Sequence, residues 1–373
     1  MKILFISMPS IHAARWISNV EDECNELYWF NVLSKDNVEF ENKVVKFNEW
    51  HRRKVAPIKG EYTLSKKSPE LYDLIRPILE ITENQYLHQI ISQIKPDIIH
   101  VFEMQTCFYP IIKTLKSFTE IKIIYSCWGS DLFYYQNFHV HLLKIKKALK
   151  LVDLLHVDNT RDKLIASKLG YDGVTAVIPG GGGYKIGAYL KFKKPISQRS
   201  IILIKGYEHD FGRALNVLKA IKDIHVPDGL KVVVFGAHAK TTTFINENKL
   251  NIETYGRHDL NHVELLELMG KAYIYIGNSI SDGMPNTLIE SMIMGAFPIQ
   301  SNPGGSTEDL VIHHCNGCLL NNPLDIKDIS NQISFALNEK HIVQKAFKHN
   351  ELLINSKYNF ELINKQINDL YNT

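Results

Sequence analysis

Short runs of apolar residues alternate with longer amphipathic stretches along the first half of the chain. KILFIS, LYWFNVL, DIIHVF, KIIYSCW, LLHV and VTAVI look like buried strands. Between several of them apolar residues recur at spacings of three and four, as in LYDLIRPILEITENQYLHQIISQI, which is typical of a helix. This alternation favours a parallel sheet that is covered by helices.

The pattern stops at PGGGGYKIGAYLKFKKPISQRS, residues 179–200, whose glycines and basic, proline-containing sequence are typical of a flexible connection. A second alternating block follows, with strand candidates IILI, KVVVF, YIYIG and FPIQ. We therefore predict an α/β protein of two doubly wound, Rossmann-like domains that face each other across a cleft, with ligands beyond the carboxyl ends of the strands. The predicted parts are an N-terminal domain (1–180), a linker (181–198), a second domain (199–350) and a C-terminal helix (351–373) that crosses back to the first domain.

Composition excludes several classes of protein. The chain has 373 residues, 45% of them hydrophobic, and a net charge of +3, which is too weak to indicate a nucleic-acid partner. No apolar run approaches the roughly 18 residues of a membrane-spanning helix, and MKILFISMPS resembles a first strand more than a signal peptide. Five cysteines in a chain of this length indicate a reducing cytoplasm.

Cys315 and Cys318 form a CxxC pair in HHCNGC. A metal or redox site is one interpretation. The absence of a second such pair and the turn dipeptide Asn316-Gly317 favour a plain turn.

The stretch SISDGMPNTLIES, residues 279–291, carries the most specific chemistry. It follows the strand candidate YIYIG, and the carboxylates Asp282 and Glu290 flank the small-residue loop 283–286. Pro285 suits the first turn of a helix, and a helix N-terminus behind small residues binds phosphate well. Glu290 can then reach ribose hydroxyls, while Asp282 can accept hydrogen bonds from a second polyol. Alternatively, Asp282 caps the helix and Glu290 is a solvated surface acid.

Loops at other strand ends supply further candidates. VVVFGAH and TYGRHDL would enclose a nucleotide in the second domain, through Gly236, His238, Gly256, Arg257 and His258. In the first domain, Glu103 follows DIIHVF, and SMPSIHAARW places His12 and Arg15 behind Ser10, a possible helix cap. His12 either faces the cleft or packs locally, and Trp16 is expected in the core.

SDGMPNTLIESMIMGAFPIQSNPGGSTEDL resembles the donor site of the family 4 retaining glycosyltransferases, which have the GT-B fold. In their signature two acids are separated by seven residues, as Asp282 and Glu290 are here, and Ser291-Met292 stands in place of the usual Ala-Met. The resemblance implies that Asp282 contacts the donor sugar and that Glu290 binds the ribose. It assigns the sugar and phosphates to Met284, Pro285, Asn286 and Thr287. Asp282 is one methylene shorter than the usual Glu, which leaves the position and identity of the sugar open.

The same resemblance implies an Arg and a Lys that neutralise the diphosphate after the first strand of the second domain. In the matching segment, ILIKGYEHDFGRAL, Tyr207 occupies the usual Arg position. Lys205, with Gly206 beside it, and Arg213 are the available candidates, and Arg213 is preferred because it opens a helix near a strand end. Surface solvation is the alternative for both cations.

YSCWGSD resembles the His-Gly-x-Asp loop of the family, with Trp128 in place of the His. The resemblance makes Asp131 a candidate contact to acceptor or donor, with helix capping as the alternative.

The resemblance implies a retaining, metal-independent hexosyltransferase. It would move a sugar from a nucleotide-sugar, UDP- or GDP-linked, to a glycan, lipid-linked or protein acceptor in polysaccharide, lipopolysaccharide or other cell-surface glycan synthesis. No cofactor or metal is expected, since no Asp-x-Asp pair follows a strand. Two alternatives remain. One is a protein that binds a sugar nucleotide with little turnover, which Asp282, Tyr207 and Trp128 keep open. The other is a different GT-B enzyme such as an epimerase.

Two basic stretches interleave lysine or arginine with apolar residues, WHRRKVAPIKGEYTLSKK (50–67) and HLLKIKKALK (141–150). Such faces could rest on an anionic leaflet. The prediction is a cytoplasmic protein with peripheral association at the inner face of the plasma membrane. The alternative is an ordinary amphipathic helix with solvated lysines.

Overall fold

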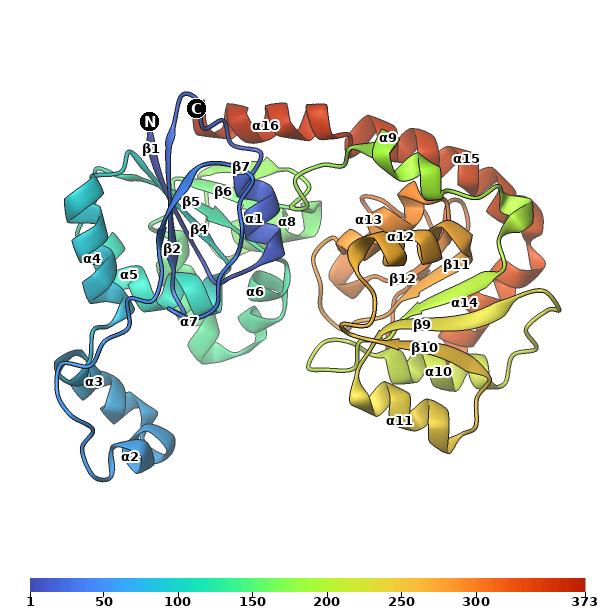
Figure 1. Cartoon of the computed structure of the whole chain (residues 1–373), viewed down its shortest axis with the longest axis horizontal. Helices are drawn as coiled ribbons and strands as arrows, with labels where there is room; N and C mark the ends of the chain where they lie inside the picture. The colour runs from blue at the N-terminus through green and yellow to red at the C-terminus, as the bar shows by residue number, and fades with distance from the viewer. Residues whose placement is uncertain (373) are drawn as a thin grey trace. The chain divides into compact units, whose positions relative to one another are not determined.

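A computed structural model describes residues 1–372, which form two compact units (Figure 1). Unit 1 comprises 1–157, 165–176 and the chain from Ile367 on, and unit 2 comprises 158–164 and 177–366. These divisions differ from the expected ones, because 158–164 belongs to unit 2 and so does the glycine-rich stretch expected to be a linker. Tyr184 fastens that stretch, since its N–H donates to the Tyr358 carbonyl at 2.8 Å and its own carbonyl accepts from Phe360 N–H at 3.0 Å.

Unit 1 contains a seven-stranded sheet in the order β3-β2-β1-β4-β5-β6-β7. The strands are β1 (Lys2–Ser7), β2 (Glu26–Asn31), β3 (Val44–Phe47), β4 (Ile98–Phe102), β5 (Lys122–Ser126), β6 (Leu154–Val157) and β7 (Val174–Val177). The pairs from β3 through β6 are parallel, and β1 is hydrogen-bonded to both β2 and β4. Because β1 is central, five of its six residues are buried, and its sequence is a continuous apolar run.

The helices of unit 1 alternate with these strands (Figure 1). They are α1 (Ile11–Ile17), α2 (Glu61–Lys67), α3 (Pro69–Leu79), α4 (Glu83–Ile94), α5 (Ile112–Leu115), α6 (Ser130–Phe133), α7 (His139–Leu149) and the second part of α8 (Thr160–Lys168), from Ile165 on. The long helical pattern of 71–94 forms two helices, α3 and α4. The break occurs because Thr82 and Gln85 form a reciprocal capping box at the start of α4.

Unit 2 contains a six-stranded parallel sheet in the order β10-β9-β8-β11-β12-β13. Its strands are β8 (Ile201–Lys205), β9 (Lys231–Ala237), β10 (Ile252–Gly256), β11 (Ala272–Gly277), β12 (Phe297–Ser301) and β13 (Cys318–Leu320). Ile202 and Ile204 pack into one hydrophobic cluster while Ile201 and Leu203 pack into another, so both faces of the sheet are covered. The prediction of two doubly wound α/β units is confirmed.

The helices of unit 2 are α9 (Ile186–Tyr189), α10 (Ala214–Lys222), α11 (Ala239–Glu247), α12 (His262–Lys271), α13 (Asn286–Ile293), α14 (Ile326–Asn338), α15 (Lys340–Lys357) and the first part of α16 (Phe360–Asn372). The chain returns to unit 1 within α16, at Ile367. There the Tyr371 hydroxyl lies 2.8 Å from Trp16 Nε1 and 2.6 Å from His100 Nδ1, and Trp16 is buried in the core as expected.

Three local features bear on the sequence predictions. Among residues 1–372, no helix combines the length and hydrophobicity that a membrane crossing requires. Cys318 is buried in β13 and Cys315 is exposed in the preceding turn, and both are free thiols. Within the described chain, no group of three or more His, Cys, Asp or Glu side chains is arranged to hold a metal ion.

Candidate functional site

The loop between β11 and α13 lies at the carboxyl end of a central strand of unit 2. Helix α13 begins at Asn286, and Pro285 is its N-cap residue with φ −66° and ψ 124°. Pro285 thus precedes the first turn, one position earlier than expected. Because proline has no side-chain acceptor, the capping residue leaves the first N–H groups of α13 to other partners. The start of α13 therefore has the character of an anion-binding helix end.

Asp282 lies four residues before α13 and is partly exposed. Its Oδ1 accepts a hydrogen bond from the N–H of Gly283 at 2.9 Å. This contact shapes the loop and leaves the helix end uncapped by Asp282.

Asp158, which sequence reasoning missed, supports the same loop. It follows β6, and its Oδ2 accepts a hydrogen bond from Met284 N–H at 3.0 Å. A Cβ at position 283 would lie 2.7 Å from that Oδ2, so only glycine fits there undisturbed. Burial, with Asp162 nearby, raises the pKa of Asp158 to about 7. The sequence feature that could have identified Asp158 is its position, as an acid directly after the predicted strand LLHV.

Glu290 is buried in α13, with 3% of its surface exposed, so it is not the solvated acid of the alternative interpretation. Its Oε1 lies 2.9 Å from Nε2 of His262, the first residue of α12. The half-exposed imidazole therefore orients a carboxylate that is itself removed from water. His262 was also missed, because nothing in HVELLELMG points to a partner 28 residues away.

Four side chains gather at the ends of β8 and β9. Lys205 Nζ lies 4.7 Å from the centroid of the Tyr207 ring, and the His238 ring lies 5.3 Å from that of Tyr207 and 5.5 Å from that of His209. Burial and the neighbouring His238 and Lys205 lower the pKa of His209, while the Asp282 carboxylate raises it. Asp282 therefore lies within electrostatic reach of this cluster, which we name the Lys205–His238 cluster. Sequence reasoning missed His209.

A glycine of β9 and the ring nitrogens of His238 complete the Lys205–His238 cluster. Gly236 has φ +62°, and a Cβ there would lie 2.6 Å from the Tyr207 ring, so glycine lets the ring pack against β9. His238 Nδ1 lies 3.2 Å from the Glu208 carbonyl oxygen, while its buried Nε2 has no partner within residues 1–372. Gly206 directly follows β8, and its carbonyl oxygen accepts a hydrogen bond from His238 N–H at 3.1 Å. Because the Glu208 carbonyl can only accept, Nδ1 carries the ring proton, so Nε2 can donate to an anion only when the imidazole is protonated.

Arg213 has a different role from the one its sequence suggested. Its Nη1 donates to the carbonyls of His209 and Gly212 at 2.8 and 2.7 Å, and its Nη2 donates to that of Asp210 at 3.1 Å. Its N–H donates to the Asn278 carbonyl at 2.9 Å. The guanidinium thus fixes its own loop, and the backbone N–H joins that loop to the β11–α13 loop.

Arg257 and His258 lie at the end of β10, as expected, and both are exposed. Gly256 N–H donates to Asp259 Oδ2 at 2.6 Å, which shapes this turn. No described contact brings either side chain to the loop of Asp282, so their assignment rests on position alone.

In unit 1, Ser10 caps α1 as expected, since its Oγ accepts from His12 N–H at 3.1 Å. The exposed His12 ring lies 5.9 Å from Trp128 in an edge-to-face arrangement. Arg15 lies one turn further along α1. The structure thus brings His12 together with the tryptophan that replaces the family's histidine.

The two acids of unit 1 bond inward. Glu103, held at φ +66°, accepts hydrogen bonds from the N–H groups of Gln105, Thr106 and Cys107 at 2.8, 2.6 and 3.2 Å. Asp131 is 2% exposed and accepts from the Tyr125 hydroxyl at 2.5 Å and Trp128 N–H at 2.9 Å. Burial and Glu103 raise the pKa of Asp131 to about 7. Both carboxylates act within the fold as capping and loop-bracing groups.

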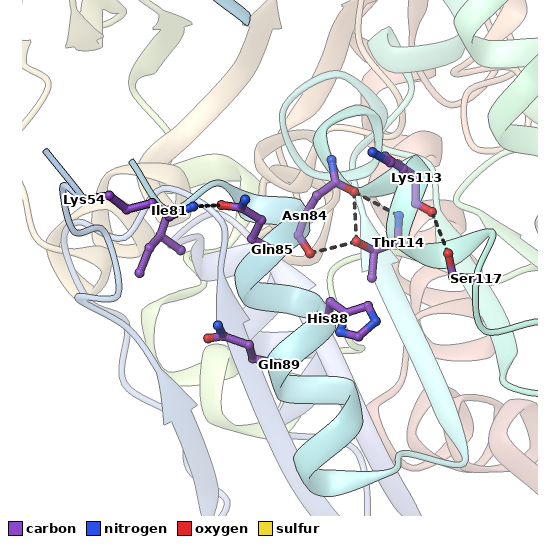
Figure 2. Close-up of a pocket in the computed structure, with 9 residues that line it drawn as sticks. All are labelled: Lys54, Ile81, Asn84, Gln85, His88, Gln89, Lys113, Thr114 and Ser117. Atoms are coloured by element: carbon purple, nitrogen blue, oxygen red, sulfur yellow. Dashed lines mark hydrogen bonds between the residues drawn. The ribbon is translucent and has the colours of Figure 1, made fainter. Parts of the chain in front are cut away.

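A pocket of about 490 Å³ lies elsewhere on unit 1, beside the start of α4 (Figure 2). Its lining comes from α4, α5 and the chain before α4, and consists of Lys54, Ile81, Asn84, Gln85, His88, Gln89, Lys113, Thr114 and Ser117. Figure 2 shows Asn84 and Thr114 joined to each other. None of the candidate residues above lines this pocket.

Two family models match the chain in consecutive segments. Residues 198–360 match glycosyl transferases group 1, and residues 2–159 match the glycosyl transferase 4-like model. No curated protein sequence matches the chain.

Solved structures show the same fold at low sequence identity. Anabaena HepE in complex with UDP and glucose has a TM-score of 0.68 at 14% identity, over 100% of this chain and 99% of HepE. Sucrose-phosphate synthase of Thermosynechococcus elongatus has a TM-score of 0.71 at 16% identity, over 100% and 98% of the two chains. The UDP-forming α,α-trehalose-phosphate synthase of Burkholderia xenovorans, in complex with glucose-6-phosphate, has a TM-score of 0.67 at 12% identity, over 100% of both chains.

Proposed function

The chain belongs to the family 4-type glycosyltransferases of the GT-B fold, and we propose that it is a retaining enzyme that moves a hexose from UDP to an acceptor hydroxyl. UDP is preferred over GDP because structures of the similarly folded HepE contain UDP and UDP-glucose. The single observation that carries the proposal is the pair of Asp282 and the buried, His262-oriented Glu290 around the start of α13.

We assign the ribose to Glu290. A carboxylate that is buried and oriented before the ligand arrives can accept two hydroxyl hydrogen bonds without losing further side-chain freedom. We assign the donor sugar to Asp282, which lies partly exposed on the far side of the same loop. The backbone N–H groups of Asn286 and Thr287, at the start of α13, then face the diphosphate and the sugar, because Met284 N–H already donates to Asp158 and Pro285 has no N–H.

Departure of UDP places negative charge on the diphosphate, and the Lys205–His238 cluster is suited to stabilise it. Lys205 supplies a permanent charge, and His209, whose Nδ1 accepts from Phe211 N–H, supplies Nε2–H as a donor. His238 adds a donor at Nε2 when its ring is protonated. Arg213 acts indirectly, because its guanidinium shapes the loop that carries His209. With these donors and the helix end, we propose that the reaction needs neither metal nor cofactor.

The acceptor side belongs to unit 1. The exposed His12 and the partly exposed Trp128 form its aromatic surface, and Arg15 follows His12 by one turn of α1. Glu103 and Asp131 hold the loops that present it. We propose a glycan or lipid-linked acceptor, a role in cell-surface polysaccharide or lipopolysaccharide synthesis, and peripheral association with an anionic membrane.

A thermal-shift panel with UDP, GDP, dTDP, ADP and CMP tests the donor assignment. A ligand that binds only the folded chain raises its stability by RT ln(1 + [L]/Kd). UDP should raise the melting temperature of wild type and not of Glu290→Ala. A shift with no diphosphate would overturn the donor site. A UDP shift without consumption of any UDP-hexose would favour a binding protein over an enzyme.

A further inference from the structure

Helix α3 turns an apolar stripe toward solvent. Leu71, Leu74 and Ile78 recur at spacings of three and four, and they are 52%, 75% and 69% exposed. The opposite side of the helix packs inward, where Leu79 is its buried residue. A helix that is apolar on two sides needs a second partner for its outer side.

The neighbouring segment extends this surface. Val55, Ile58 and Tyr62 are exposed large apolar residues in the chain before α2 and in α2 itself. No residue of α2 is buried, and the Tyr72 hydroxyl of α3 donates to Glu61 Oε1 of α2 at 3.2 Å. We name the whole the α2–α3 pair, residues 51–79. Figure 1 shows the pair set apart from the sheet of unit 1.

The α2–α3 pair is held firmly at its base. Arg53 makes a bidentate ion pair with Glu61, at 2.8 Å for each bond. Arg76 bonds Glu80 at 2.5 Å and Glu83 at 2.8 Å, and Glu83 is the first residue of α4. Two backbone hydrogen bonds join the chain before α2 to the chain at the end of α3. Lys54 N–H donates to the Leu79 carbonyl and Ile81 N–H donates to the Arg52 carbonyl, each at 2.9 Å. The exposed stripe therefore belongs to a braced element.

Exposed cations outnumber exposed acids in the α2–α3 pair. Arg52, Lys59, Lys66 and Lys67 are all exposed, whereas the other two arginines of the pair are neutralised by the ion pairs above. Glu70 and Asp73 are its exposed acids. At the base, the pocket of Figure 2 is lined by Lys54, Lys113 and His88, and none of its described lining residues is acidic.

The position of the pair follows from the topology. It lies between the end of β3 and the start of α4, and both lie at the carboxyl edge of a parallel sheet. The start of α7 lies at this edge too, where Phe138, Val140 and Leu143 are exposed next to the exposed Lys144, Lys146 and Lys147. Two basic, apolar surfaces thus share the edge that carries His12 and Trp128.

We propose that the α2–α3 pair docks unit 1 on an anionic lipid bilayer, with Leu71, Leu74 and Ile78 inserted among the headgroups and the exposed lysines of the pair on lipid phosphates. The α2–α3 pair would be the element that carries the membrane association of the proposed function, and the need for such an association rests on that function. A second copy of the chain is the other occupant of such a stripe. A two-fold contact would bring together two surfaces on which the four exposed cations outnumber Glu70 and Asp73, so charge favours the bilayer.

Co-sedimentation with vesicles tests the proposal. Wild type should bind vesicles of phosphatidylcholine with about a third phosphatidylglycerol and bind pure phosphatidylcholine at least tenfold more weakly. The variant Leu71→Ser/Leu74→Ser/Ile78→Ser should lose at least tenfold in partition coefficient, and Lys59→Gln/Lys66→Gln/Lys67→Gln should lose most of the salt dependence. Matched controls on unit 2 are Ile312→Ser/Leu324→Ser/Leu352→Ser and Lys219→Gln/Lys222→Gln/Lys348→Gln, at residues that are similarly exposed.

Equal binding to both vesicle types, or equal loss in the control variants, would overturn the proposal. So would a wild-type dimer in light scattering that the apolar variant converts to monomer. The UDP thermal shift of each variant separates the two proposals. Retained UDP binding with lost vesicle binding supports docking, whereas vesicle binding without any UDP shift leaves docking standing and removes the donor assignment.

Discussion

His262 Nε2 lies 2.9 Å from Glu290 Oε1, so the first residue of one helix orients a carboxylate that is buried in the next. The carboxylate is nearly excluded from water while the imidazole is half exposed. A ligand that binds Glu290 therefore meets an acceptor whose direction is already set.

Glu290→Ala should weaken UDP binding about 10- to 100-fold, because hydrogen bonds to a charged group contribute about 1.5–3 kcal/mol. His262→Ala should weaken it less, since Glu290 remains but loses its orienting partner. Isothermal titration of UDP into the single and double variants measures both effects. The double variant should match Glu290→Ala alone, because the two residues act as one unit. Glu267→Ala, at an exposed acid of the same α12, is the control.

Asp282→Ala should reduce turnover far more than binding. If Asp282 holds the sugar as charge develops at the reacting carbon, its loss should lower the rate of UDP release from a UDP-hexose by about 100-fold. The Kd for UDP should stay within about threefold, since UDP lacks the sugar. Equal losses in both quantities would instead assign Asp282 to the loop, through its bond to Gly283.

Gly212→Ala should separate the two donor loops. A Cβ at position 212 would lie 2.4 Å from the Tyr207 carbonyl oxygen, a backbone atom that cannot rotate away. Gly212 also forms the bridge to Ser279 that joins the loops after β8 and β11. We expect a loss of about 1–3 kcal/mol in the free energy of unfolding and at least tenfold weaker UDP binding. Gly187→Ala, where nothing lies within 4 Å of the added Cβ, should change neither.

Asp131 should make unit 1 less stable as pH rises. Its pKa is about 7 in the folded chain and about 3.9 when unfolded, so between these values the folded state binds the extra proton. The free energy of unfolding therefore falls as pH rises through this window. Relative to Asp131→Asn, wild type should lose about 1–3 kcal/mol between pH 5 and pH 7.

Urea unfolding followed by tryptophan fluorescence measures this difference. All four tryptophans, at positions 16, 29, 50 and 128, lie in unit 1, so the signal reports that unit. Asp228→Asn, an exposed acid of unit 2, is the control. A pH-independent difference between wild type and Asp131→Asn would contradict the raised pKa.

The sequence by itself determined the class of fold and the place of the donor loop. Short continuous apolar runs such as IILI are typical of strands buried on both faces, and their alternation with helices favours a parallel sheet. Because every loop after such a strand reaches the carboxyl edge, Asp282 and Glu290 were expected at that edge. The short strands β3 and β13 escaped prediction, since VVKF or CLL is too brief to stand out from a loop.

Only the tertiary structure decided which partners meet. Met284 with Asp158, and Glu290 with His262, are separated by 126 and 28 residues, and no local pattern encodes the strand order that joins them. The same holds for His209 beside His238, and for Arg213, whose guanidinium is taken by carbonyls of its own loop. Periodicity reports that a helix has an apolar side, but α3 has two, and only packing decides that Leu71, Leu74 and Ile78 face outward.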